Sequence, residues 1–362
     1  MSHVLLVGAG GNIGSHVVPL LTRIPEITRL TLVDRDVYED RNRGNQDIHP
    51  GAIGRKKALV QVDRVRRRNP DLPVRAICED IETMPLGAFR CDLLLAALDS
   101  RKARQHINQV ASRLGIPWLD AGVLGGAMLA RVTRYMPAED LPCLECRWDA
   151  ADYAAIEQTY PCEAAEQPPR TAPPPSSLGA LAAALLALEC RKLLNADAAS
   201  LPPGSELVVD ARHHRQFVSS ARRNPACRFV HHAPWAVQPF PIAPRTALGA
   251  AFEHLGRPLG ANGGLTLSVD GKRIVRRLVC EGCGAVKSVL RLRGALRPTD
   301  QKCSGCGGTM AINGFGLLED LAAASLTRSE RNRSLASIGI RSGEVVTVSE
   351  SGHSLHFELV AP

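Results

Sequence analysis

The stretch VLLVGAGGNIGSHVVPLL, residues 4–21, sets a short apolar run against a glycine-rich loop and a helix-like segment. Residues 4–7 are as short and apolar as a buried strand, and we predict a helix from about Ser15. A tight turn and a close backbone approach to a phosphate are permitted by four glycines: Gly8, Gly10, Gly11 and Gly14. This pattern predicts a nucleotide-binding fold, and a glycine turn without a ligand is the alternative.

The glycine spacing bears on which nucleotide binds. The dinucleotide fingerprint Gly-x-Gly-x-x-Gly is not matched, because Ile13 stands at its third glycine position and the glycine follows at Gly14. Asp34 ends a second apolar run, LTLVD, where an acidic side chain would hydrogen-bond the ribose of any adenosine nucleotide. NAD and ATP therefore both remain open, with the glycine spacing arguing against NAD.

Length and composition limit the class of protein. A chain of 362 residues with 45% hydrophobic residues is long enough for about two globular domains. The longest apolar helix-like stretch, residues 178–190, is shorter than the ~20 residues that span a bilayer, and the N-terminus lacks a signal-peptide pattern. We therefore expect a cytoplasmic protein with no membrane partner.

The cysteines point to metal binding. Eleven cysteines in a chain without a secretion signal favour metal sites over a disulfide framework. CEGC and CSGC each place two thiolates in a glycine-containing turn, and a hairpin between them would close the loop. Four thiolates leave no open position on the ion, so this pattern predicts a structural Zn²⁺ in a zinc ribbon, with redox disulfides as the alternative. The predicted ligands are Cys280, Cys283, Cys303 and Cys306.

The net charge of +8 is concentrated near this ribbon. Residues 271–300 carry eight Lys or Arg residues against Glu281 and Asp300. An acidic partner and a solvated surface both fit this excess. Few aromatic residues are present for base stacking, which argues against nucleic acid.

The order of apolar runs predicts the architecture. Up to about residue 135, strands alternate with helices, which indicates an α/β fold with a doubly wound, Rossmann-like, mostly parallel sheet. Prolines in residues 166–177 predict an exposed crossing loop before the apolar helix, and residues 207–218 predict a closing strand pair. We divide the chain into an ATP-binding domain over 1–232, a proline-rich linker over 233–248, a zinc-ribbon module over 249–315 and a helix-strand tail over 316–362.

Three stretches carry a resemblance to a known family. LVDRDVYEDRNRGNQ, GRKKA and LAALDSRKARQHIN resemble, in order and spacing, the adenylation domain of the ThiF/MoeB-like family, to which ubiquitin-activating enzymes belong. The resemblance covers residues 4 to about 195 and continues weakly to about 232. It implies ATP-dependent adenylation of the C-terminal carboxylate of a ubiquitin-like or sulfur-carrier protein that ends in glycine. Thioester formation and transfer to a conjugating enzyme or sulfur acceptor would follow.

The resemblance also implies an ATP site. Asp34, with Asp36 beside it, would bind the ribose, and Asn42 and Gln46 would line the nucleotide. Lys57 would contact the phosphates; the alternative is a solvated lysine, with Lys56 as a competitor.

The same resemblance assigns the start of a later helix. Asp99 would hold Mg²⁺, and a helix N-cap is its alternative role. Arg104 and Asn108 match the family's arginine and asparagine, and the arginine would help to hold the site together.

Three departures from the family stand out. Asn45 replaces an arginine, so one phosphate contact is missing or moves to Arg41 or Arg43, and Asn12 with Ile13 lengthens the glycine loop by one residue. The chain begins almost at the first strand, so we do not expect the arginine that a partner's N-terminal helix often supplies. A homodimer therefore stays open.

The remaining cysteines divide into three groups. Cys143 and Cys146 match the family's first zinc pair, and Cys227 with His231, ahead of His232, would complete that site, with free buried thiols as the alternative. Cys162, before the crossing loop, stands where thioester-forming members have a nucleophile, and an ordinary loop cysteine is the alternative. We expect three others in the core: Cys78, Cys91 and Cys190.

Two rival functions and one weak resemblance complete the predictions. The enzyme rival is a NAD-dependent Rossmann oxidoreductase. The non-enzyme rival is a nucleotide-regulated scaffold that binds nucleic acid through the basic ribbon. In the tail, LASIGIRSGEVVTV resembles a fragment of a ubiquitin-like β-grasp fold, and a plain capping hairpin is its alternative.

Overall fold

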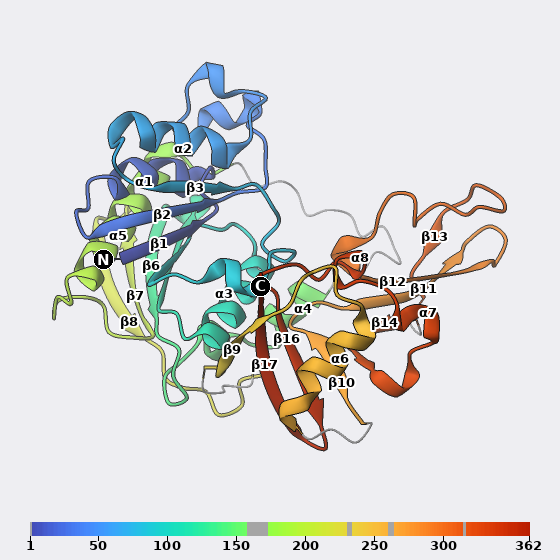
Figure 1. Cartoon of the computed structure of the whole chain (residues 1–362). Coiled ribbons are helices and arrows are strands. Elements are labelled where there is room, and N and C mark those ends of the chain that lie inside the picture. Colours follow the sequence, from blue (N-terminus) through green and yellow to red (C-terminus); the bar gives the residue numbers. More distant parts are fainter. Residues whose placement is uncertain (1, 158–172, 230–233, 260–263, 314–315) are drawn as a thin grey trace. The chain divides into compact units, whose positions relative to one another are not determined.

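A computed structural model describes residues 2–157, 173–229, 234–259, 264–313 and 316–362 (Figure 1). Two compact units make up the chain. The first comprises Met1–Ile81 and Phe89–Pro234, and the second comprises Glu82–Ala88 and Trp235–Pro362.

The first unit is built on an eight-stranded sheet in the order β3-β2-β1-β4-β5-β6-β7-β8. Five strands are parallel to one another: β1 (Ser2–Val7), β2 (Ile27–Val33), β3 (Val74–Ile77), β4 (Leu93–Ala96) and β5 (Trp118–Leu124). Three more continue the sheet in antiparallel fashion: β6 (Leu129–Tyr135), β7 (Ser205–Asp210) and β8 (Arg215–Ser220). The predicted Rossmann-like α/β fold is confirmed, including the closing strand pair.

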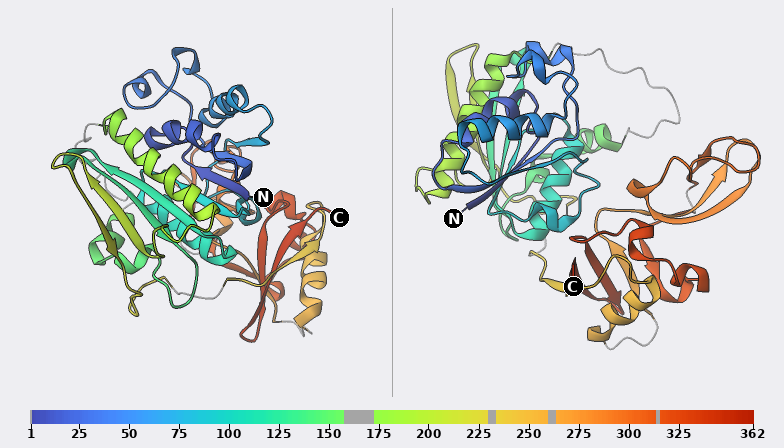
Figure 2. Two further views of the ribbon diagram at one scale, coloured as in Figure 1. Left: turned by 90° about the vertical axis from the view of Figure 1, so that its left-hand side faces the viewer. Right: turned by 45° about the horizontal axis from the view of Figure 1, so that its top comes forward.

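The helices of this unit cover the sheet. They are α1 (Asn12–Leu21), α2 (Lys57–Arg68), α3 (Arg101–Leu114), α4 (Ala150–Glu157) and α5 (Ser176–Leu194). α1 and α5 lie side by side and pack on one face (Figure 2). Because side chains alternate along β1, Val4 and Leu6 enter the core under these helices. Strands buried on both faces account for the continuous apolar runs. No helix in the described ranges is both long and apolar enough to cross a membrane.

The second unit contains two smaller sheets. A five-stranded sheet has the order β15-β10-β16-β17-β9, and β12-β11-β13 forms the other, with β14 beside β11. The strands are β9 (Val237–Pro241), β10 (Thr266–Val269), β11 (Ile274–Cys280), β12 (Val286–Leu292), β13 (Met310–Ala311), β14 (Leu317–Leu318), β15 (Asp320–Ala322), β16 (Val345–Glu350) and β17 (His353–Val360). The helices are α6 (Leu248–Gly256), α7 (Arg328–Arg331) and α8 (Leu335–Ile338).

The predicted linker over 233–248 is corrected by the structure. Residues 237–241 form β9, which pairs in parallel with β17. Pro239 and Pro241 are tolerated there because β9 lies at the edge of its sheet, where one side of the strand has no neighbour to bond.

The predicted separation of a ribbon over 249–315 from a tail over 316–362 is also corrected. β10 pairs with β16 of the tail, and Leu248, Ile274 and Phe357 share one core. A local sequence pattern does not reveal pairing between strands that lie so far apart along the chain. The helix, turn and strand expected in the tail are present as α8 and β16.

A short segment between β3 and β4 belongs to the second unit. Met84 is buried there, and the backbone N–H of Gly87 donates to the carbonyl of Gly343 at 2.8 Å. A Cβ at position 87 would lie 2.7 Å from that carbonyl oxygen and would clash with the Glu358 carboxylate. Only glycine fits without a shift of the neighbouring chain.

We expect Gly87→Ala to lower the free energy of unfolding by about 1–3 kcal/mol, because backbone has to move. Urea denaturation would measure this change. Gly264→Ala is the matched control, since its Cβ would meet nothing closer than 3.7 Å. Equal stability of the two variants would contradict the packing described for the 82–88 segment.

Candidate active site

Three of the predicted site segments follow neighbouring parallel strands. Gly8 follows β1, Asp34 follows β2, and Asp99 lies shortly after β4. β1 lies between β2 and β4, so the carboxyl ends of these strands meet at one edge of the sheet. Open α/β sheets bind ligands at this kind of edge, where the strand order reverses.

The glycine loop is tightly packed. Gly8 has a positive φ of 75°, and an added Cβ would clash with the Ala97 carbonyl. A Cβ on Gly14 would clash with Gly8, and one on Gly10 would clash with the Lys57 side chain. Gly11 differs, because its Cβ would meet nothing closer than 3.5 Å. The loop therefore has three glycines fixed by packing, whereas a Cβ at Gly11 would make only ordinary van der Waals contacts.

Gly11 is also the N-cap of α1. No side chain hydrogen-bonds to this cap, and the first turn of α1 contains no acidic residue. The backbone N–H groups of a helix's first turn favour an anion. The N-terminus of α1 thus has the polarity that favours a phosphate.

Asp34 holds this loop through hydrogen bonds to its carboxylate. Its carboxylate accepts the backbone N–H of Gly10 at 2.8 Å and that of Asp36 at 3.0 Å. Burial raises the pKa of the Asp34 carboxyl, while these two N–H donors oppose the rise. Asp36 is the more exposed carboxylate of the two.

Lys57 is buried beside the loop. The residue is only 6% exposed, and its Nζ lies 3.7 Å from the Asp36 carboxylate and 5.5 Å from the centre of the Tyr38 ring. Lys56, in contrast, is exposed and donates to the Arg35 carbonyl at 2.9 Å. The alternative of a solvated Lys57 is wrong, and the geometry favours Lys57 over its neighbour.

Asn42 and Gln46 lie on a short turn after β2. Asn42 is part of a 3₁₀ helix, Asp40–Gly44, and its Oδ1 accepts the N–H of Glu39 at 2.9 Å. Gln46 Oε1 is buried and has no hydrogen-bond partner among the described atoms. A buried polar atom of this kind is costly unless a ligand or water meets it.

The arginines expected to replace the missing family arginine are engaged nearby. Arg41 pairs with Glu39 at 2.6 Å, and Arg43 pairs with Asp40 at 3.2 Å. Arg64, which the sequence analysis did not single out, donates to the carbonyl of Ser15 in α1 at 2.9 Å. Its charge therefore reaches the first turns of α1 from the α2 side.

Asp99 is exposed and does not cap α3. The N-cap is Ser100, whose hydroxyl accepts the N–H of Ala103 at 3.3 Å. The N-cap alternative for Asp99 is therefore wrong, and its carboxylate remains on the surface at the carboxyl edge of the sheet.

Arg104 is held by a buried acid that sequence reasoning missed. Its Nε donates to the carboxylate of the fully buried Asp120 at 2.9 Å. Its Nη2 donates to the carbonyl of Leu98, the residue before Asp99. Asp120 also accepts Arg131 at 2.8 Å, which in turn pairs with Glu206 at 3.1 Å. An acid inside the apolar run of residues 118–124 was the available sequence signal. Arg104 thus fixes the backbone that presents Asp99.

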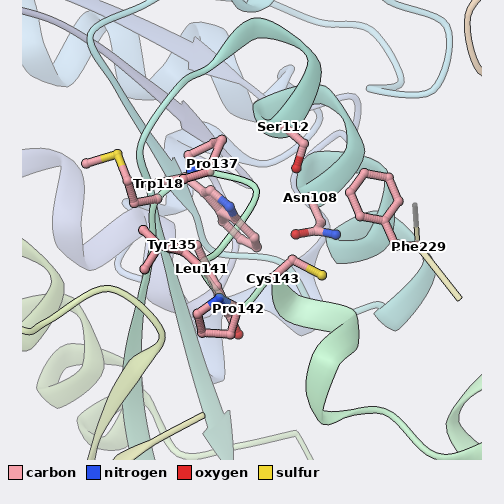
Figure 3. A pocket seen from close by; sticks show the side chains of 11 residues that line it. Asn108, Ser112, Trp118, Tyr135, Pro137, Leu141, Pro142, Cys143 and Phe229 are labelled. Carbon is pink, nitrogen blue, oxygen red and sulfur yellow. The ribbon is translucent and has the colours of Figure 1, made fainter. Parts of the chain in front are cut away.

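The first cysteine set comes together in this unit. The Sγ of Cys143 lies 3.9 Å from those of Cys146 and Cys227, so one ion could be held by all three thiols. Asn108 supports the loop, since its Oδ1 accepts the N–H of Leu144 at 3.2 Å. Cys143 also borders a pocket lined by aromatic side chains (Figure 3). His231, the predicted fourth ligand, and Cys162 both lie outside the described residues.

The second cysteine set also converges. Cys280 lies 3.4 Å from Cys306, and Cys283 lies 3.7 Å from Cys303, measured between sulfurs. All four sulfurs could hold a single metal ion. Of the cysteines expected in the core, Cys190 is fully buried, whereas Cys78 and Cys91 are partly buried.

The basic stretch near this set is largely paired. Arg276 binds the Glu330 carboxylate at 2.8 Å, and Arg291 binds Asp300 at 3.0 Å. Lys272 pairs with Glu344 at 2.6 Å. Much of the positive charge therefore stabilises the second unit itself.

We expect Asp120→Ala to cost about 3–5 kcal/mol of unfolding free energy, because it leaves two arginines without their buried partner. Chemical denaturation would measure the loss. Arg147→Ala is the matched control; it removes an arginine that does not contact Asp120 and pairs with Glu206 at 3.3 Å, and it should cost about 1 kcal/mol. A loss below about 1 kcal/mol for Asp120→Ala would contradict the role given to this network.

Comparison with known proteins places this geometry in a family. The NEDD8-activating enzyme E1 catalytic subunit of Saccharomyces cerevisiae is 29% identical over 156 residues, covering 40% of this chain and 51% of that protein. Ubiquitin-like modifier-activating enzyme 5 of Bombyx mori is 28% identical over 156 residues, covering 40% and 39%. The chain therefore spans about half or less of the length of these relatives.

A solved structure shares the fold. E. coli MccB with succinimide aligns with a TM-score of 0.52 and 22% identity, covering 63% of this chain and 66% of MccB. MccB with ATP aligns with a TM-score of 0.51. The model of the ThiF family matches residues 1–229, which confirms the family predicted from the sequence. The chain belongs to the ThiF family.

Proposed function

We propose that this protein is an ATP-dependent adenylyltransferase that activates the C-terminal carboxylate of a ubiquitin-like or sulfur-carrier protein. The observation that carries the proposal is the packing of Gly10 between Asp34 and Lys57, next to an open helix N-terminus. Named relatives support the substrate class, since they activate NEDD8 and SUMO. MccB has been solved with ATP and, in another structure, with MccA.

The chemistry explains why these groups are needed. A carboxylate is a poor acyl donor, because its leaving group would be oxide. Its oxygen attacks the α-phosphorus of ATP, the bond to pyrophosphate breaks, and a mixed acyl-phosphate anhydride with AMP forms. Negative charge builds on the phosphates in this step and calls for N–H donors and cations at fixed places.

The residues fit these requirements. The N–H groups at the start of α1 and the amino group of Lys57 would meet the phosphates, and Gln46 Oε1 offers an unpaired acceptor to the nucleotide. Asp34 and Asp36 would bind the ribose, with Asn42 beside them. Asp99 would hold Mg²⁺, which neutralises phosphate charge when bound. Arg104 would act as a positioning residue through the Leu98 carbonyl.

We assign the next step to Cys162. Its thiolate would attack the carbonyl carbon of the anhydride, forming a C–S bond and releasing AMP. A conjugating enzyme or a sulfur acceptor would then take the acyl group. This assignment rests on the place of Cys162 in the sequence, before the proline-rich stretch and α5.

We further propose a structural Zn²⁺ at each cysteine set. Cys143, Cys146 and Cys227, with His231, would form one tetrahedral site. The four thiolates of the second unit would form the other, and its position between β11 and β13 would lock the small sheet. Neither site leaves a position open for catalysis.

ATP–pyrophosphate exchange tests the adenylation directly. With small carrier proteins ending in Gly-Gly, we expect carrier-dependent exchange that falls on the order of a hundredfold in Asp99→Ala. Cys162→Ala should keep exchange but lose the thioester seen by non-reducing gel electrophoresis. Asp71→Ala changes an exposed aspartate elsewhere and serves as the control. Exchange that survives Asp99→Ala would contradict the magnesium assignment.

Metal analysis tests the two zinc sites. Cys143→Ala and Cys303→Ala should each lower the zinc content by about one equivalent per chain, because each removes one of four ligands. Cys190→Ala, a buried thiol outside both sets, should not change the zinc content. Protein purified without zinc yet folded and fully stable would rule out both sites.

A further inference from the structure

Asn12, which with Ile13 lengthens the glycine loop by one residue, is the first residue of α1. Its side-chain Nδ2 donates to the carbonyl of Pro174 at 2.9 Å and lies 3.5 Å from that of Pro175. These prolines directly precede α5. Asn12 thus connects the glycine loop, through a hydrogen bond, to the segment that leads into α5, far away in the sequence.

Gly179 leaves the space that Asn12 occupies. A Cβ at position 179 would overlap the Asn12 side chain and would lie 3.1 Å from the Asn12 backbone oxygen. The φ of Gly179 is not positive, so glycine is needed here for space and not for backbone conformation. Asn12 and Gly179 are therefore matched: the asparagine side chain fits only where residue 179 has none.

The backbone at Pro174 also lies close to Gly125. The Cβ of an alanine at Gly125, after β5, would lie 3.1 Å from Pro174 Cα. Proline fixes its own φ, so a chain of three prolines over 173–175 is stiff. The carbonyl that accepts the Asn12 hydrogen bond therefore belongs to a stiff backbone segment.

The same two helices also touch one turn further along. His16 of α1 and Ser176 of α5 form a hydrogen bond of 2.9 Å between Nε2 and Oγ. This bond joins α1 to α5 but does not involve the glycine loop. It offers an internal control that separates general helix packing from an effect on the loop.

We propose that Asn12 is a positioning residue for ATP and that Gly179 provides the space in which the Asn12 side chain lies. This inference rests on the proposed function. A loop lengthened by one residue has more conformations to lose on binding phosphate. The bond to Pro174 restricts that freedom beforehand and holds the N–H groups of the first turn of α1 where the phosphates would lie.

The proposal predicts which kinetic constant changes. The Asn12 side chain bonds to Pro174 and is assigned no contact with the carrier protein, so its loss should weaken ATP binding and leave the KM for the carrier protein unchanged. Loss of one hydrogen bond and its ordering effect should raise the KM and the Kd for ATP about tenfold. Gly179→Ala should do the same by displacing the Asn12 side chain.

A double-mutant cycle tests the match between the two residues. Binding of a non-hydrolysable ATP analogue by calorimetry, and the KM for ATP in exchange, are measured for wild type, Asn12→Ala, Gly179→Ala and the double variant. We expect the double variant to be no worse than Asn12→Ala alone, because the overlap with the Asn12 amide group is gone and only the 3.1 Å approach to the Asn12 backbone oxygen is left. Ser176→Ala, the control, should lower the melting temperature slightly and leave ATP binding unchanged.

The outcomes separate a failure of the role of Asn12 from a failure of the proposed adenylation. If wild type binds ATP and both folded single variants bind it equally well, the role of Asn12 is refuted while adenylation stands. If the effects of the two substitutions simply add, the match between them is refuted. If wild type does not bind ATP at all, the proposed function fails and this inference fails with it. Should Gly179→Ala not fold, Asn12→Ala and the double variant still decide the question.

Discussion

The bond between the Gly10 N–H and the Asp34 carboxylate is the interaction on which the site depends. It ties the loop after β1 to the end of β2, and the same glycine packs against Lys57 at the start of α2. Three chain segments are therefore fixed relative to one another by one residue without a side chain. A larger residue at position 10 would push Lys57 away and would disturb the Tyr38 hydroxyl, which would lie 2.9 Å from the added Cβ.

Two buried carboxylates near this bond are stabilised in different ways. Asp34 is buried and supported by backbone N–H groups, whereas Asp120 is buried and supported by Arg104 and Arg131. Both acids serve the backbone near the carboxyl edge of the sheet. Asp36 and Asp99 remain exposed at that edge, where carboxylates can meet a nucleotide or its metal ion.

The sequence predicted what local patterns encode. Apolar runs and glycine spacing located β1, β2 and α1, and the stretch around Asp99 and Arg104 pointed to the family. The structure added what depends on distant contacts: Asp120 as the partner of Arg104, Arg64 beside α1, and the bond from Asn12 to Pro174. In the second unit, proline-rich residues 237–241 formed a strand because an edge position tolerates them.

The fate of the carrier's carboxylate oxygen tests adenylation most directly. A carrier protein whose C-terminal carboxylate is labelled with a heavy oxygen isotope is incubated with ATP and the enzyme, and the released nucleotide is analysed by mass spectrometry. Attack of the carboxylate on the α-phosphorus, followed by cleavage at the acyl carbon, leaves the label in AMP. Label in inorganic phosphate, or unlabelled AMP together with acylated enzyme, would contradict the account.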